Sequence, residues 1–188
     1  NALAAATVAM RYGMAPETVA RILASQHTIS PHRMALSTVN REGTSFTLID
    51  DSFNANPDSM KAGLNGLKAW NSNDGKEPFR VALLGAMLEL GADETALHTS
   101  IGTYADELGI DAIIAVGSAQ DQHLDALAQA LADGARQSQS ASVDCVHDID
   151  AAEQLVIDLA RNHPDAVVLL KGSHASGLSA LAERWAKN

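Results

Sequence analysis

Apolar and polar positions follow two different periods along this chain. Mostly apolar runs occur at residues 79–87, 111–117, 143–149 and 166–172. Segments with helical spacing of apolar residues alternate with them, at 59–70, 94–108, 120–132, 151–162 and 178–187. Uninterrupted apolar strands separated by helices are typical of a parallel sheet that is covered on both faces. The pattern therefore predicts an α/β fold with a Rossmann-like, doubly wound, mostly parallel sheet.

The beginning of the chain has a different pattern. Residues 1–11 are rich in alanine, and "APETVARILAS" starts a second helix with Pro16 in its first turn, where the missing amide costs nothing. This short helical segment is too small to fold alone. Residues 33–40 and 44–50 are partly alternating runs joined by a turn that ends in Gly43. They predict an N-terminal antiparallel hairpin on the sheet.

Composition and charge narrow the class of protein. The chain has 188 residues, 46% of them hydrophobic and 19% charged, which is ordinary for a soluble globular protein. A net charge of −10 with 13 scattered Lys and Arg residues argues against a nucleic-acid-binding surface. No apolar run is long enough to span a bilayer. Cys145 stands alone in an apolar stretch, so we expect a buried structural thiol in a reducing, cytoplasmic setting.

Several common catalytic motifs are absent. The sequence has neither a "GxxxxGK[ST]" phosphate loop nor a "GxGxxG" dinucleotide fingerprint after a first strand. Its seven His residues do not form a zinc set, and no Ser, His and acid trio sits in a nucleophile elbow. We therefore predict no metal site, and we do not expect this chain to hydrolyse a nucleotide by itself.

The stretch "LIDDSFNANPDSMKAGL", residues 48–64, places many short polar side chains at the end of a predicted strand. Open α/β sheets bind ligands at the carboxyl ends of their strands. Asp58 and Ser59 are explained by the start of the next helix. One cap needs one side chain, whereas four more polar residues share this turn: Asp50, Asp51, Asn54 and Asn56. Because carboxylates accept from ribose hydroxyls and Asn amides both donate and accept, we interpret the turn as a ligand site.

"DDSFNANPDSM" resembles the "DDSYNANPDS" signature of the C-terminal domain of the Mur ligase family, in its D-alanyl-D-alanine-adding type. Other segments agree in the same order, so the resemblance covers nearly the whole chain: "NALAAA", "PHR", "LLGAMLELG", "LHTSIGTYADELGID" and "LLKGSHASGL". The resemblance implies that residues 1–29 are the helical tail of a central ATPase domain. Residues 30–188 would be the C-terminal domain.

The resemblance also implies a reaction. Members of this type are ATP-dependent amide ligases of peptidoglycan precursor synthesis. They phosphorylate the carboxylate of UDP-N-acetylmuramoyl-tripeptide, and the amine of D-alanyl-D-alanine then attacks the acyl phosphate. ATP would be the co-substrate, and Mg²⁺ would be bound mainly by the central domain. We therefore expect this chain to be inactive alone, to work with the other domains of the same protein, and to be monomeric.

Site residues follow from the resemblance position by position, and no catalytic residue is assigned. Asn1 would lie near the adenine, Arg33 at the nucleotide, and Asp51 at the ribose or the adjoining phosphates. The substrate-binding candidates are Ser52, Asn54, Ala55, Asn56, Lys171, Gly172, Ser173, His174 and Ser176. Simpler roles remain open: a helix N-cap for Asn1, a surface charge for Arg33, a turn for Asp51 and a solvated strand end for Lys171.

Two positions depart from the family pattern. Ala86 stands where the family usually has Asp, and His174 where it often has Arg. A His side chain is shorter and mostly neutral at pH 7. Glu89 could replace the lost carboxylate, or it could be an exposed acid at a helix start. We expect His98 and His123 to be surface or partly packed residues rather than ligands.

Two competing functions remain. The chain could belong to another ligase of the superfamily, of the folylpolyglutamate or cyanophycin type, although the "NANPDS" run argues against this. Alternatively, it could be a non-catalytic binding module that kept the fold, for which Ala86 is the best support.

Overall fold

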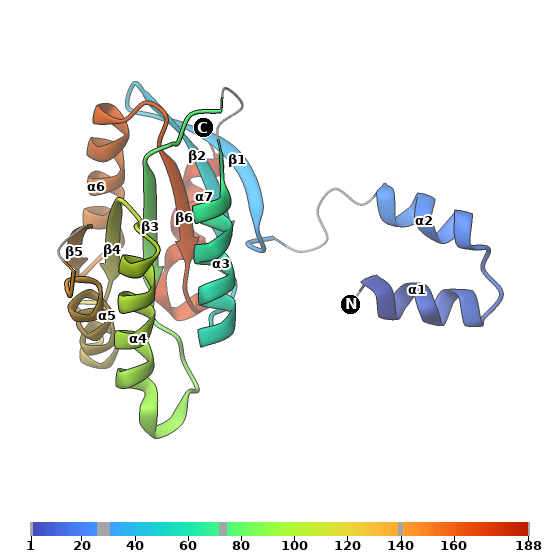
Figure 1. The fold of residues 1–188 in the computed structure, drawn as a ribbon, viewed down its shortest axis with the longest axis horizontal. Coiled ribbons are helices and arrows are strands. Elements are labelled where there is room, and N and C mark those ends of the chain that lie inside the picture. The colour runs from blue at the N-terminus through green and yellow to red at the C-terminus, as the bar shows by residue number, and fades with distance from the viewer. Residues whose placement is uncertain (1, 26–30, 72–74, 139–140, 188) are drawn as a thin grey trace. The chain divides into compact units, whose positions relative to one another are not determined.

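The structure is a computed structural model that describes residues 2–25, 31–71, 75–138 and 141–187. The chain divides into two compact units, residues 1–31 and 32–188. In the first unit, α1 (Ala2–Arg11) and α2 (Pro16–Ala24) form the predicted helical pair (Figure 1). Only Ala6 and Val19 are buried in the described part of this unit, as expected for a segment too small to have its own core.

Six strands of the described residues form one sheet in the second unit. Their bounds are β1 (Ala35–Arg41), β2 (Thr44–Asp51), β3 (Arg80–Gly85), β4 (Ala112–Val116), β5 (Ser142–Val146) and β6 (Val167–Lys171). The spatial order is β1-β2-β6-β3-β4-β5. β1 is antiparallel to β2, and all other neighbours are parallel. The predicted mostly parallel sheet with an antiparallel hairpin is confirmed.

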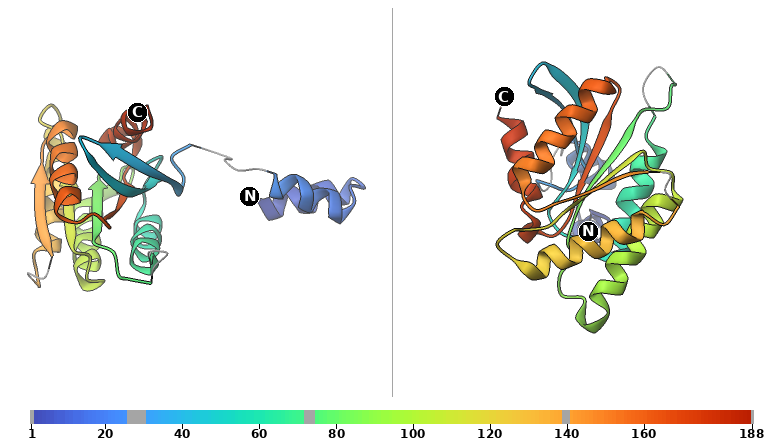
Figure 2. Two further views of the ribbon diagram at one scale, coloured as in Figure 1. Left: turned by 90° about the horizontal axis from the view of Figure 1, so that it is seen from above. Right: turned by 90° about the vertical axis from the view of Figure 1, so that its left-hand side faces the viewer.

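Helices cover both faces of this sheet (Figures 1 and 2). Their bounds are α3 (Pro57–Ala69), α4 (Glu94–Glu107), α5 (Gln122–Ala135), α6 (Ile149–Asn162) and α7 (Leu178–Ala186), with short 3₁₀ helices η1 (Gly91–Asp93) and η2 (His174–Ser176). Side chains of α3, α4 and α5 share one buried cluster, and side chains of α6 and α7 share another. The sheet is therefore the middle layer of three.

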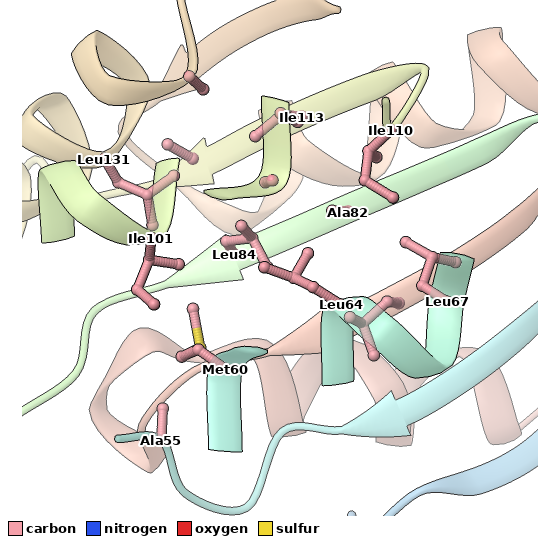
Figure 3. Close-up of a cluster of buried hydrophobic side chains, with 14 of the residues drawn as sticks. Ala55, Met60, Leu64, Leu67, Ala82, Leu84, Ile101, Ile110, Ile113 and Leu131 are labelled. Atoms are coloured by element: carbon pink, nitrogen blue, oxygen red, sulfur yellow. The ribbon is translucent and has the colours of Figure 1, made fainter. Parts of the chain in front are cut away.

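Alternation along the strands divides the core into two layers. In β3, Ala82 and Leu84 face the helices α3 to α5, whereas Val81 and Leu83 face α6 and α7. Met60, Leu64 and Leu67 on α3 recur at helical spacing and are fully buried in the first layer (Figure 3). Burial of each such side chain stabilises the fold by about 1.5–3 kcal/mol. These layers fix the strand ends from which the candidate site is built.

The hairpin turn is tighter than predicted. β1 extends to Arg41 and β2 begins at Thr44, so only Glu42 and Gly43 connect them. Their φ angles are 47° and 79°. Positive φ at both central residues is the requirement of a type I′ turn, whose twist matches that of the flanking strands. The turn therefore fixes the register that pairs Ala35 with Asp50.

Two further expectations concern Cys145 and membrane-spanning helices. Cys145 on β5 is half-buried rather than fully buried, and burial is the main cause that raises the pKa of its thiol. A raised pKa keeps the thiol protonated, which agrees with a structural role. Among the described helices, none has both the length and the apolar character that a membrane crossing requires.

Candidate functional site

Three segments that are distant in sequence meet at one end of the sheet. Because β2, β6 and β3 are parallel neighbours, their carboxyl ends lie side by side. The connections that leave these ends are residues 52–56, 172–177 and 86–90. All three segments belong to the motifs that resemble the Mur ligase pattern in the sequence. The sheet order thus brings the predicted polar residues to one edge, where open α/β sheets bind ligands.

The two consecutive aspartates point to opposite faces of the sheet. Asp50 is 8% exposed, and its Oδ1 accepts hydrogen bonds from the amide and hydroxyl of Ser52, the latter at 2.6 Å. Its Oδ2 lies 2.8 Å from Nδ1 of His32. Asp50 therefore ties the beginning of this unit to the β2 end. This buried, internally bonded position is structural, in contrast to the ligand role that its place in the turn suggested.

Asp51 lies on the other face, the one covered by α3. Its Oδ2 is 2.8 Å from Nζ of Lys171, and its Oδ1 accepts from the amide of Met34 at 3.3 Å. Its side chain remains 18% exposed. Asp51 therefore has a fixed orientation and is still reached by solvent, as a ligand-binding carboxylate must be.

Arg33 occupies a constrained position beside Asp51. It lies between His32 and Met34, whose φ angles are 58° and 51°. Left-handed backbone costs a non-glycine residue of order 1–3 kcal/mol, and here the bonds of His32 to Asp50 and of Met34 to Asp51 hold it in place. The Arg33 guanidinium is exposed and lies 4.2 Å from the centre of the Phe53 ring. A cation over an aromatic face is stabilised without losing its outer donors.

Two adjoining pockets open around the β2 turn. The larger has a volume of about 840 Å³ and is lined by Phe53, Asn54, Ala55, Asn56, Leu88, Glu89, Leu90, Ser173, His174 and Ala175. The smaller has a volume of about 150 Å³ and is lined by Arg33, Asp51, Phe53, Asn54, Ala55, Asn56, Ser59 and Lys171. Residues 53–56 line both pockets. Of the candidate nucleotide residues, Arg33 and Asp51 line only the smaller pocket. Of the candidate substrate residues, Ser173 and His174 line only the larger pocket, and Lys171 lines the smaller one.

Asp58 and Ser59 lie in the first turn of α3, as the sequence predicts, but the N-cap is a residue that was interpreted as part of the ligand site. Asn56, and not Asp58 or Ser59, is the N-cap, and its side chain accepts from the amide of Ser59 at 2.8 Å. The Ser59 hydroxyl in turn accepts from the Asn56 amide at 3.0 Å. This reciprocal pair satisfies two amides that a helix start would otherwise leave unpaired. Asn56 thus has a structural role in addition to its place in both pockets.

Lys171 is buried, so the interpretation as a solvated strand end is wrong. The residue is 2% exposed, and Nζ donates to the carbonyl oxygens of Asn54 at 2.9 Å and Asp51 at 3.4 Å. Together with the Asp51 carboxylate, these contacts use all three protons of the ammonium group.

The turn after β6 supplies the opposite wall of the larger pocket. Ser173 is 5% exposed, and its hydroxyl oxygen has no hydrogen-bond partner within the described residues. His174 is exposed at the same pocket. Gly172, Ser176 and Ser52 are buried and line neither pocket, with the Ser176 hydroxyl donating to the Ser173 carbonyl at 2.6 Å. These three support the wall instead of forming it, so a direct substrate contact remains only a prediction for them.

The loop after β3 contains residues that the sequence argument missed. Leu88 and Leu90 line the larger pocket beside the exposed Glu89, whose φ of 62° is left-handed. Ala86 is 1% exposed, packs against Leu124 and lines neither pocket. No polar motif marked the two leucines, because an apolar loop residue looks like core in the sequence alone.

His98 is fully buried, which corrects the expectation of a surface or partly packed residue. Its Nε2 accepts from the amide of Met87 at 2.8 Å, and its Nδ1 donates to the carbonyl of Glu94 at 2.7 Å. Burial is the main cause that lowers the pKa of His98, so the ring stays neutral and keeps this acceptor. His98 thereby anchors the pocket loop 86–90 to α4. His123 is largely exposed, as predicted.

Asn1 lies outside the described residues, so its proposed place near an adenine is still a prediction. The assignment of residues 1–29 to a preceding domain also stays a prediction. No group of three His, Cys, Asp or Glu side chains in the described ranges is arranged to hold a metal ion.

Comparison with known proteins identifies the family. A protein-family model described as "Mur ligase, glutamate ligase domain" matches residues 32–174. The chain belongs to the Mur ligase family. A relative from Mycobacterium tuberculosis (strain CDC 1551 / Oshkosh), named UDP-N-acetylmuramoyl-tripeptide--D-alanyl-D-alanine ligase, is 39% identical over 189 residues, which cover 97% of this Mur ligase chain. The chain spans 36% of the length of that relative.

Solved structures support the fold of this Mur ligase domain. A crystal structure of MurF from Acinetobacter baumannii matches all of the chain and 37% of its own length, with a TM-score of 0.76 and 24% identity. A structure of MurF ligase from Thermotoga maritima in complex with ADP matches 92% of this chain and 36% of its own, with a TM-score of 0.56 and 21% identity. At these identities the likeness concerns the fold.

Proposed function

We propose that this chain is the C-terminal domain of an ATP-dependent ligase that joins D-alanyl-D-alanine to UDP-N-acetylmuramoyl-tripeptide through an acyl phosphate, in peptidoglycan precursor synthesis. The observation that carries the proposal is the position of the "DDSFNAN" turn. In one Mur ligase chain, this turn separates a small pocket lined by Arg33 and Asp51 from a large pocket lined by Ser173 and His174.

The small pocket is suited to the nucleotide. Arg33 presents an exposed guanidinium, which has donors that match phosphate oxygens in pairs. Asp51 presents an oriented carboxylate that can accept from the two hydroxyls of a ribose. A pocket of about 150 Å³ is too small for a whole ATP, so the nucleotide would lie mainly on another domain, with this edge contacting its ribose and phosphates.

The large pocket is suited to a small zwitterion. Its volume of about 840 Å³ lies in the ordinary range for small-molecule sites. Asn54 and Asn56 offer donors and acceptors on one wall, and Ser173 and His174 offer them on the other. The unpartnered Ser173 hydroxyl is notable, because a buried polar group without a partner costs about 1–3 kcal/mol. Because this oxygen is itself inaccessible, the Ser173 side chain would have to turn toward the pocket for a substrate group to bond to it and recover this cost.

The remaining chemistry requires groups that this chain does not have. Formation of an acyl phosphate needs a cradle for the triphosphate and Mg²⁺ to offset the developing charge. No group of three His, Cys, Asp or Glu side chains among the described residues is arranged to hold a metal ion, and the sequence has no phosphate loop. We therefore assign both to a preceding central domain, of which residues 1–29 would be the tail. Closure of the two domains would complete the site and exclude water from the acyl phosphate. The chain alone would be inactive.

A non-catalytic module of the same fold is the second candidate. Its best support was the replacement of an acid by Ala86. Ala86 is buried against Leu124 and lines neither pocket, so this change removes no group from the pocket walls. This geometry favours the catalytic proposal.

The test uses the full-length protein that contains this chain. Phosphate release from ATP should require both UDP-N-acetylmuramoyl-tripeptide and D-alanyl-D-alanine. Release that depends on a glutamate-type acceptor, or on aspartate and arginine, would support another ligase of the superfamily. A protein that binds ATP or D-alanyl-D-alanine but releases no phosphate with any acceptor would support the non-catalytic module. The cytoplasmic location and the monomeric state stay predictions, and gel filtration of the same protein tests the latter.

A further inference from the structure

Lys171 is an internal cation whose donors are all engaged by the β2 turn. The Asp51 carboxylate, the Asn54 carbonyl and the Asp51 carbonyl lie within 3.4 Å of its Nζ. With 2% of its surface exposed, Lys171 has no proton left for a ligand in this geometry. Lys171 and Asp51 line the smaller pocket, and Asn54 lines both pockets.

The fold makes room for the aliphatic stem of this lysine. Gly63 is buried on α3, and a Cβ atom added there would lie 2.9 Å from Cδ of Lys171. Real Cβ atoms do not approach so closely, so any larger residue at this position would displace the stem. Gly63 therefore provides the space through which Lys171 reaches the turn from β6.

A buried charge is costly unless its partners are well placed, so the same bonds constrain the partners. Each partner is also bonded to a second group. The Asp51 Oδ1 accepts from the Met34 amide, next to Arg33, and the Asn54 side chain accepts from the Ala55 amide. Lys171 thus lies at the centre of a bonded network that spans both pockets.

We propose that Lys171 is a positioning residue that fixes Asp51 at the nucleotide side and Asn54 at the dipeptide side, and that it contacts neither substrate. The inference rests on the proposed function for the identity of the two substrates. Its consequence is that one buried side chain, 117 residues away from Asn54 in the sequence, sets the geometry of both halves of the site.

The first test is Lys171→Met in the full-length protein. A positioning role predicts that KM rises for both ATP and D-alanyl-D-alanine, each by about tenfold, the effect expected if each substrate loses one hydrogen bond when Asp51 and Asn54 shift. A direct contact with one substrate would raise only the KM of that substrate. In an Asp51→Asn background, Lys171→Met should add little to the ATP effect, because the two residues act as one unit. Fully multiplicative effects would overturn the proposal.

The second test keeps the amine of Lys171 but displaces its aliphatic stem. Gly63→Ala should raise both KM values in the same direction as Lys171→Met. Gly66→Ala, on the same helix, is the matched control, because its added Cβ would meet only the terminal methyl of Met34 at an ordinary 3.4 Å. It should leave both KM values unchanged. Equal KM values in wild type and Gly63→Ala, with the stem displaced in its crystal structure, would contradict a positioning role.

A third measurement does not depend on the reaction. In the full-length protein, Lys171→Met should increase the hydrogen exchange of the Met34 and Ala55 amides, which bond to the held side chains, while the Val81 amide in the central strand keeps its protection. Unchanged exchange at both amides would overturn the positioning role. If the wild-type enzyme showed no dipeptide-dependent phosphate release, the proposed function would fail, and accelerated exchange would still uphold the role of Lys171.

Discussion

Asp51 and Lys171 are directly opposite each other in the register of β2 and β6, although 120 residues separate them in the chain. Both side chains lie on the sheet face covered by α3, because alternate residues of neighbouring strands share a face. The ion pair is therefore a product of the strand order. Any change that removes one member leaves the other charge in a largely buried place.

This pairing changes what Asp51→Ala is expected to do. From the sequence alone, we expect this variant to impair the ATP kinetics of the enzyme far more than its folding. With Lys171 left unpaired, however, breaking the buried pair should cost about 3–5 kcal/mol of unfolding free energy. Asp51→Asn keeps an oxygen that can accept from Lys171 and should cost less. Urea unfolding of both variants measures this difference, and an Asp51→Ala protein as stable as wild type would contradict the pairing.

Asn56 combines a cap with a place in both pockets, and two substitutions separate these roles. Asn56→Ala should lower the unfolding free energy by about 1 kcal/mol, because the Ser59 amide loses its acceptor. Asn56→Ser should retain the cap while withdrawing the amide from the pocket. If Asn56 binds the dipeptide, the KM for D-alanyl-D-alanine rises in both variants. An unchanged KM in Asn56→Ser would leave Asn56 as a cap only.

His98 should make stability depend on pH in a defined direction. Its pKa in the folded protein is lowered by burial, whereas the unfolded chain has the ordinary value of 6.5. The unfolded state therefore binds a proton first as the pH falls, and the stabilisation is lost below about 6.5, down to the lowered pKa. Above 6.5 it is fully present.

The measurement compares unfolding free energies of wild type and His98→Gln between pH 5 and pH 8, a range chosen about the ordinary pKa of His. Gln can still accept from the Met87 amide but does not titrate. The difference between the two proteins should therefore shrink toward pH 5. A difference that stayed constant with pH would show that His98 is not held neutral.

The crossing of α4 and α5 should not tolerate a methyl group at Gly102. An added Cβ would overlap the carbonyl oxygen of Leu131, which is backbone and cannot move aside. Gly102→Ala should therefore destabilise the fold by about 1–3 kcal/mol. Gly66→Ala is again the control, since it should be neutral or stabilise α3 by up to about 1 kcal/mol. Thermal unfolding distinguishes the two, and equal midpoints would contradict the close approach.

Local sequence patterns predicted most of the fold. Mostly apolar runs predicted the strands of the parallel sheet, and polar residues after them predicted where its ligand edge lies. Helix starts were less well placed, because Asn56, Pro57 and Ser59 can each begin a helix by local rules. Only the reciprocal bonds between Asn56 and Ser59 select the cap. His98 could not be placed at all, since an amphipathic helix does not reveal which polar side chain faces a loop amide.

The sequence by itself determined the α/β class, the hairpin, the family resemblance and the strand ends that carry polar residues, because these depend on local periodicity and on short contiguous motifs. Only the tertiary structure decided that Asp50 is internal while Asp51 faces a pocket, that Lys171 is buried between Asp51 and α3, and that Ala86 lines neither pocket. The physical reason is the order of the strands. Side-chain direction alternates along each strand, and the order of β2 and β6 brings Lys171 to Asp51 and Asn54, which lie 120 and 117 residues away in the chain.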